Sequence, residues 1–182
     1  VERRYDENCD STFIACNVAK KFTGVQGENS IYYHDSSLVN GAGDNSYRFT
    51  GASDSVNNYV CFGSDETTCS VDNLYRIIGV FGGRVKLIKA DYATTADVGT
   101  PYSTIAKDIT YPGYTKQSTI NRYQWDSANK NTWSTASLNT LLNNTYLTNL
   151  GTTWSNKIAT STYYVSGYNT NSANSATFYT AE

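Results

Sequence analysis

Two apolar runs flank the dipeptide Gly82-Gly83 in the stretch 73–89. Glycine accepts positive φ without steric cost, so a two-residue Gly-Gly loop suits the tight turn of a β-hairpin. The register of such a hairpin predicts four facing pairs: Val80–Val85, Ile78–Leu87, Ile77–Ile88 and Phe81–Arg84. Both faces of the hairpin are then largely apolar, which is typical of strands covered on two sides.

Shorter runs of strand character lie before and after this hairpin. They predict strands at 31–34, 46–50 and 59–62, separated by turn-rich loops, with Tyr47 and Phe49 on one face of the second. Further strands are expected at 121–125, 162–168 and 177–180. Residues 90–120, which hold the only two prolines, have no clear period and are expected to form a long surface loop.

Two stretches have helical spacing. Asp10 or Ser11 would cap a helix that runs to about residue 22 and ends before Gly24. Its inward-facing residues would be Phe13, Cys16, Val18 and Phe22.

The second helix spans 133–142, with Ser134 as N-cap. Three leucines fall at i, i+3 and i+4, namely Leu138, Leu141 and Leu142. Gly151 would end this unit, and residues 153–158 would add one more helical turn. With Trp125, this helix is expected to cover one face of the hairpin.

The patterns together predict an α+β fold that is rich in β structure. Its antiparallel strands would form a meander or hairpins, with one or two short helices packed on the sheet. The predicted division is an N-terminal helical segment at 1–24 and a single β-rich domain at 25–182.

Composition supports the strands and excludes some partners. The chain of 182 residues has 16 tyrosines and only 16% charged residues, which favours strands over helices. The net charge is −2 and the basic residues are scattered, so nucleic acid is not an expected partner. No run approaches the roughly 18 apolar residues that span a bilayer. The chain has no methionine and begins with Val1, so we expect a mature form after removal of an N-terminal segment, or an excised fragment.

The four cysteines form two close pairs, Cys9 with Cys16 and Cys61 with Cys69. An even count in a short chain of this composition predicts disulfides and an extracellular location. Four cysteines permit three connectivities, and the spacing favours Cys61–Cys69 with Cys9–Cys16 as the second bridge. Two residues at this spacing in one regular helix lie about 10 Å apart, so Cys9 must precede the helix to reach Cys16. The gaps of six and seven residues are too long for a typical zinc site.

Several segments resemble a domain of unknown function that recurs in secreted and surface proteins of gut Firmicutes. They are Leu-Tyr-Arg-Ile-Ile-Gly-Val-Phe at 74–81, Val-Lys-Leu-Ile at 85–88, Trp125, Asn-Thr-Trp-Ser-Thr-Ala-Ser-Leu-Asn at 131–139 and Leu-Asn-Asn-Thr-Tyr-Leu at 142–147. The stretches 31–35, 45–48 and 59–63 match the segment that often precedes this domain. The resemblance covers roughly residues 25–182. It implies a layout similar to C-type-lectin-like folds, with some pilin-like relatives, and its motifs carry no known chemistry.

Members of that family usually continue into further strands beyond the segment that matches 178–182, where this chain stops. Either the chain is processed or trimmed, or a second subunit donates the missing strands. The second alternative predicts self-association in a filament or pilus-like assembly.

No residues form a pattern that predicts catalysis, a metal site or a cofactor. The only histidine, His34, stands at a strand end, and no Cys-His or Ser-His pair can be argued from it. The carboxylates cluster at 6–10 and 65–66, in polar loops rather than in facing positions. Gly79, Gly82 and Gly83 lack the helix and the Lys-Ser/Thr pair of a phosphate-binding loop.

Two weaker hypotheses concern binding and crosslinking. Aromatic side chains form the candidate ligand-binding platform for a sugar: Trp133, Trp154, Tyr163, Tyr164 and Tyr168, together with Trp125. Lys86 is a candidate for an internal isopeptide bond, although a solvated lysine explains it as well. The sequence therefore predicts a non-enzymatic extracellular surface protein with a structural or adhesive role, which associates with itself or with a host or cell-surface ligand. A lectin-like carbohydrate-binding module is the alternative, and a secreted hydrolase is the third.

Overall fold

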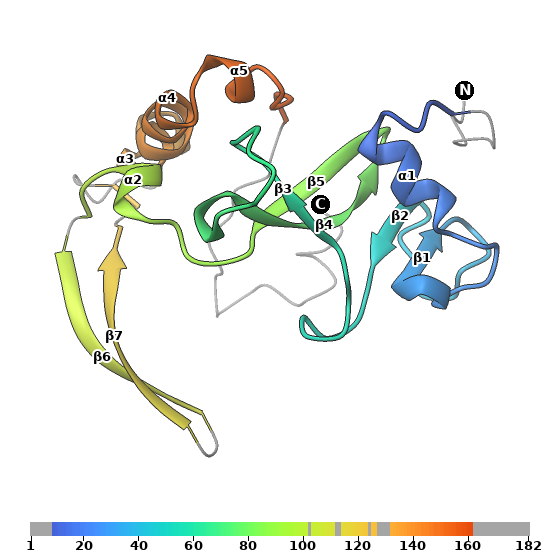
Figure 1. Cartoon of the computed structure of the whole chain (residues 1–182), viewed down its shortest axis with the longest axis horizontal. Helices are drawn as coiled ribbons and strands as arrows, with labels where there is room; N and C mark the ends of the chain where they lie inside the picture. The colour runs from blue at the N-terminus through green and yellow to red at the C-terminus, as the bar shows by residue number, and fades with distance from the viewer. Residues whose placement is uncertain (1–8, 102, 112–113, 124, 127–131, 162–182) are drawn as a thin grey trace. The chain divides into compact units, whose positions relative to one another are not determined.

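The computed structural model describes residues 9–101, 103–111, 114–123, 125–126 and 132–161, with only the backbone of 103–111 and 114–122 (Figure 1). The chain divides into two compact units, residues 1–94 and 95–182, which are described separately below. This division differs from the boundary near residue 24 that the sequence suggested.

The first unit is a five-stranded antiparallel sheet. Its strands are β1 (Ile31–His34), β2 (Ser46–Phe49), β3 (Tyr59–Cys61), β4 (Leu74–Phe81) and β5 (Arg84–Lys89), and short 3₁₀ turns at Glu28–Ser30 and Val71–Asn73 precede β1 and β4. The long strand β4 pairs with β5 along one edge, and with β2 and β3 along the other. The predicted α+β class with antiparallel hairpins is confirmed, and each predicted strand of this unit is present. In a simple meander each strand pairs with the next one in the chain. The connection from β2 to β3 departs from this, because β2 and β3 pair with β4 and not with each other.

The hairpin of β4 and β5 has the predicted Gly82-Gly83 loop, in which both glycines have positive φ. The pairs Val80–Val85 and Phe81–Arg84 are confirmed. The other two predicted pairs are wrong by one residue, because Ile77 pairs with Leu87 and Arg76 with Ile88. A β-bulge between Ile77 and Gly79 inserts Ile78 as an extra residue and shifts the register.

One face of the sheet is closed by helix α1 (Ile14–Lys20). The cluster of buried residues combines both elements: Ala15, Val18 and Ala19 from the helix with Ile31, Tyr33, Tyr47, Ile77 and Val80 from the sheet. Aromatic rings pack there edge to face and tilted, with 4.7 Å between the Tyr33 and Tyr47 centroids. Within the first unit, the cover of the hairpin is therefore α1.

Helix α1 is shorter than predicted. It begins after Phe13, which occupies the N-cap position and is 64% exposed instead of facing inward. Asp10 caps no helix; its side chain accepts the Thr12 N–H at 2.9 Å in a turn before α1. Cys16 and Val18 are buried, as expected.

Within the part of the chain that the structure describes, the opposite face of the hairpin is exposed along β5, where the sequence predicted a covered face. Along β5, the exposed residues Arg84, Lys86 and Ile88 alternate with half-buried ones. A strand with this alternation has one face in the core and one in solvent.

A side chain closes the β1 edge of the sheet. Gln26 accepts the backbone N–H of Tyr33 at 2.9 Å and donates to its carbonyl oxygen at 2.8 Å, as a neighbouring strand would do. The Gly27 N–H donates to the Ile31 carbonyl oxygen at 2.9 Å. This edge is therefore unavailable to another strand.

The second unit contains a two-stranded antiparallel sheet, β6 (Ser103–Tyr111) with β7 (Tyr114–Arg122), and a short helix α2 (Thr95–Val98). The prediction of a long surface loop at 90–120 is wrong for these residues. The Thr and Ile residues of this stretch have strand propensity, and the dipeptide Pro112-Gly113 is a turn signal, but neither was weighed against the polar composition. The strand expected at 121–125 ends instead at Arg122.

The other regular elements that the structure describes in this unit are helical. It comprises a 3₁₀ turn at Trp133–Thr135, α3 (Ser137–Thr140), a π-helical segment (Leu141–Tyr146), α4 (Leu147–Leu150) and α5 (Thr152–Ser155). The helix predicted from Trp133 begins later, after Ala136, so Ser134 is not its N-cap. Gly151, with φ of 80°, ends it as predicted, and α5 is the predicted extra turn. The strands expected at 162–168 and 177–180 lie outside the described residues.

Candidate ligand-binding face

The charge of the sheet differs from that of the whole chain. Strands β1–β5, all of them described, contain no Asp or Glu but hold five basic residues: Arg48, Arg76, Arg84, Lys86 and Lys89. The chain as a whole has 16 acidic and 14 basic residues. The sheet is thus a local concentration of positive charge, which the net charge of −2 conceals.

The strand register places four of these residues on the open face of the sheet. Arg48 and Lys86 both pair with Gly79, one from each neighbouring strand. Arg84 and Ile88 lie on the same side as Lys86, because side chains two residues apart on a strand share a face. Arg76 pairs with Ile88 and therefore lies on this side too. We call this surface the basic face; its members are Arg48, Tyr59, Arg76, Gly79, Phe81, Arg84, Lys86 and Ile88.

The first row of the basic face is built on Gly79. A Cβ at this position would contact the Phe81 ring at 3.2 Å, so the ring lies over the glycine. The Arg48 Cζ lies 5.0 Å from the ring centroid and the Lys86 Nζ lies 5.7 Å from it. Both cations are held by the electrostatic attraction of the aromatic ring.

Asp44 holds Arg48 from the other end. The Arg48 guanidinium donates to the Asp44 carboxylate at 2.7 Å, and Arg48 Nε donates to the Ser46 hydroxyl at 2.8 Å. Burial raises the pKa of Asp44, but hydrogen bonds from Ser46 and Arg48 outweigh it and lower the pKa overall. The carboxylate therefore stays ionised and fixes the direction of Arg48.

The second row centres on Arg76. Its Nε donates to the buried Asn58 side chain at 2.9 Å, and its two terminal nitrogens donate to the carbonyl oxygens of Ser53 and Val56 at 3.0 and 3.3 Å. The Arg76 Cζ lies 4.9 Å from the centroid of the Tyr59 ring. Arg76 is thus a fixed cation. Its strand partners, Tyr59 on β3 and Ile88 on β5, are both exposed and lie on either side of it.

His34 and Ser46 pair across β1 and β2 but show no catalytic arrangement in the contacts described. His34 Nδ1 accepts the backbone N–H of Ala42 at 3.1 Å, while the Ser46 hydroxyl donates to Asp44. Burial, assisted by the nearby Arg48, lowers the pKa of His34. The described residues contain no group of three or more potential metal ligands.

The structure describes only part of the predicted sugar platform. Trp133 packs against Trp125, with 5.2 Å between their centroids. One face of Trp154 carries the Lys157 ammonium, 3.9 Å from the ring centroid, so that face is covered. Tyr163, Tyr164 and Tyr168 lie outside the described residues.

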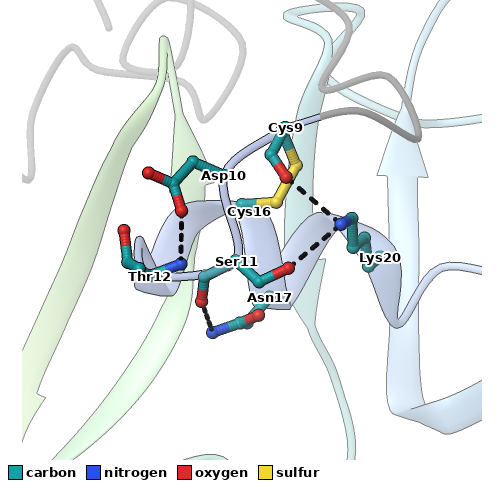
Figure 2. The surroundings of a disulfide bond; sticks show 7 residues. All are labelled: Cys9, Asp10, Ser11, Thr12, Cys16, Asn17 and Lys20. Carbon is teal, nitrogen blue, oxygen red and sulfur yellow. Dashed lines mark hydrogen bonds between the residues drawn. A yellow bond between two sulfur atoms is a disulfide. The ribbon is translucent and has the colours of Figure 1, made fainter.

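The two predicted disulfides are present. Cys9 bonds to Cys16 and Cys61 to Cys69, with Cα–Cα distances of 5.8 and 5.6 Å. Figure 2 shows Cys9 ahead of α1, where the Lys20 ammonium donates to its carbonyl oxygen at 3.2 Å. Both bonds suit an extracellular protein. No helix in the part of the chain that the structure describes has the length and apolar character of a bilayer crossing.

Sequence reasoning missed the basic face and considered Lys86 only as an isopeptide candidate or a solvated lysine. In the structure Lys86 is exposed, and its Nζ lies 5.7 Å from the centroid of the Phe81 ring. Comparison with protein-family models, with curated proteins and with solved structures gave no match to this chain. Its function is therefore argued from the geometry of the first unit.

Proposed function

We propose that this chain is a non-enzymatic, adhesive domain of an extracellular bacterial surface protein, and that it attaches through the basic face. The observation that carries the proposal is the exposed face of the sheet, where strands without Asp or Glu carry four cations. Asp44, just before β2, pairs with one of them, Arg48, so positive charge remains in excess. An exposed patch with an excess of one charge sign recruits a ligand of the opposite sign and sets its orientation.

The rigidity of the face supports binding over a merely solvated surface. Arg48 and Arg76 are each held by an aromatic ring and by at least two hydrogen bonds. Long side chains that are already ordered lose less conformational entropy when a ligand binds. The disulfides fit the same setting, because a domain outside the cell must persist in an oxidising environment.

A structural role in a filament is the second candidate. Among the described residues, β3 and β5 each pair with β4 alone, so the other edge of either strand could accept a further strand. The β5 edge carries Arg84, Lys86 and Lys89, and β3 has only three residues. Charged residues and short strands at an edge both oppose edge-to-edge pairing. The adhesive role is therefore the better supported of the two.

The test uses beads coated with the protein and exposed to mucin layers, epithelial cells and Gram-positive cell walls. The variant Arg84→Glu/Lys86→Glu reverses two cations of the basic face. The matched control Lys21→Glu/Lys157→Glu makes the same change in net charge at exposed residues outside strands β1–β5.

We expect beads that carry the wild type and the control to adhere to at least one surface, and beads that carry the reversed variant to be released. Adhesion that is absent, or equal for all three proteins, would overturn the proposal. Filaments of purified protein in electron micrographs at high concentration would favour the structural candidate instead.

A further inference from the structure

The basic face combines fixed cations with apolar surface in a way that suits one class of ligand. We propose that it binds an acidic polysaccharide, whose carboxylate or sulfate groups meet Arg48, Arg76, Arg84 and Lys86. This inference rests on the adhesive function proposed above and names its ligand.

The arginines retain hydrogen-bonding capacity for an anionic group. A guanidinium has five N–H donors. Arg76 uses three of them and Arg48 uses two in the contacts described above. The remaining donors suit the oxygens of a carboxylate or sulfate, which accept the planar fork of an arginine in pairs.

The apolar members of the face suit a sugar ring. Ile88 is 55% exposed and pairs with Arg76 across the strands. The C–H groups on one side of a pyranose ring pack against such a side chain while the charged substituents point to the cations. A polymer that carries both features fits a face on which an exposed apolar side chain stands beside several cations.

The aromatic rings argue against single-stranded nucleic acid as the ligand. Binding of that kind depends on ring faces on which bases stack. Here the Phe81 ring has Arg48 and Lys86 near its face, and the Tyr59 ring has Arg76. The rings position cations, so the ligand is recognised by its charge, and the disulfides place it outside the cell, where acidic polysaccharides are the common polyanions.

The test measures binding of the full chain to a uronic acid oligomer of defined length and to the same oligomer after reduction of its carboxyl groups. Single-stranded DNA and a poly-glutamate peptide of equal charge are the competing polyanions. We expect the uronic acid oligomer to bind, with affinity falling as salt rises, and the reduced oligomer to bind at least about tenfold more weakly.

The variants locate the site. Arg84→Glu/Lys86→Glu should weaken binding by about tenfold or more, and Lys21→Glu/Lys157→Glu by less than about twofold. Lys86→Gln, a milder change at an exposed position, should weaken binding by about two- to fivefold and covers the case in which the double variant does not fold.

Equal binding of the reduced oligomer, tighter binding of DNA or poly-glutamate, or an equal loss in the control variant would overturn the inference. Should the beads adhere through the basic face while the uronic acid oligomer does not bind, the adhesive function stands and the acidic polysaccharide is wrong. Should neither occur, both proposals fail.

Discussion

The replacement Gly79→Ala tests the close approach on which the basic face is built. Gly79 lies where β4 meets β2, beside the bulge at Ile78. An added Cβ would overlap the Tyr47 carbonyl oxygen and come within 3.1 Å of the Arg48 Cα. Both obstacles belong to the backbone of the neighbouring strand, so no side-chain rotation can make room.

The expected loss is large for a single methyl group. Overpacking of this kind costs about 1–3 kcal/mol. The pairing of β2 with β4 rests on two residue pairs, Tyr47 with Val80 and Arg48 with Gly79, and displacement of β2 weakens their hydrogen bonds by about 1 kcal/mol each. We therefore expect Gly79→Ala to lower the free energy of unfolding of the first unit by about 3–5 kcal/mol, and Tm by roughly 12–40 °C.

The measurement is urea unfolding, with hydrogen exchange of peptides that contain β2 and β4 to locate the change. Gly41→Ala is the matched control, because its φ is also ordinary and the three atoms nearest to its Cβ all belong to the Leu38 side chain, not to backbone. We expect the control to lose less than about 1 kcal/mol. A loss below about 1 kcal/mol for Gly79→Ala, with unchanged exchange in β2, would refute the close approach.

Three further changes probe the framework around the basic face. Asn58→Leu leaves Arg76 Nε without its buried acceptor, and should lower the free energy of unfolding by about 2–3 kcal/mol in urea titrations; a change under 0.5 kcal/mol, as at ordinary surface sites, would contradict this. Gln26→Ala removes two hydrogen bonds from the β1 edge, and should lower the free energy of unfolding by about 1–2 kcal/mol. The exposed edge should also increase self-association in sedimentation velocity runs, and an unchanged sedimentation profile would argue against edge closure. The pKa of His34 is lowered in the folded chain, so as pH falls the unfolded chain takes up the His34 proton at a higher pH than the folded chain does. The stability that the neutral His34 contributes is therefore fully present above pH 6.5, the ordinary pKa. It is lost as pH falls from there through the lowered folded pKa. His34→Asn, which keeps an acceptor for the Ala42 N–H, should remove that part of the pH dependence of the urea midpoint; an identical pH profile in both proteins would count against it.

The local pattern of the sequence predicted most of the first unit. The Gly82-Gly83 loop and the apolar runs on either side specify the hairpin, because turn geometry and strand period act over a few residues. The bulge was not predictable in this way. It depends on the approach of β2 to Gly79, and β2 is about 30 residues away in the chain.

The basic face was hidden for a related reason. Arg48, Arg76 and Lys86 are scattered in sequence and become neighbours only through the pairing of three strands. A net charge averages them with acidic residues in loops. The signal that would have found them is the absence of Asp and Glu from every predicted strand of the first unit.

The predicted aromatic platform stays a prediction, because three of its members lie outside the described residues. Trp133 packs against Trp125, another member, while Trp154 has Lys157 over one face. Residue type alone does not tell a sugar-binding ring from one that packs within a helical region.

The most direct test of a binding role for the basic face is a titration of isotope-labelled protein with the uronic acid oligomer, followed by NMR. We predict that the backbone amides of Arg48, Arg76, Gly79 and Lys86, and the arginine Nε–H signals, shift together and saturate at one ligand concentration. Shifts confined to the region of Trp133 and Trp154, or no shifts at all, would contradict it.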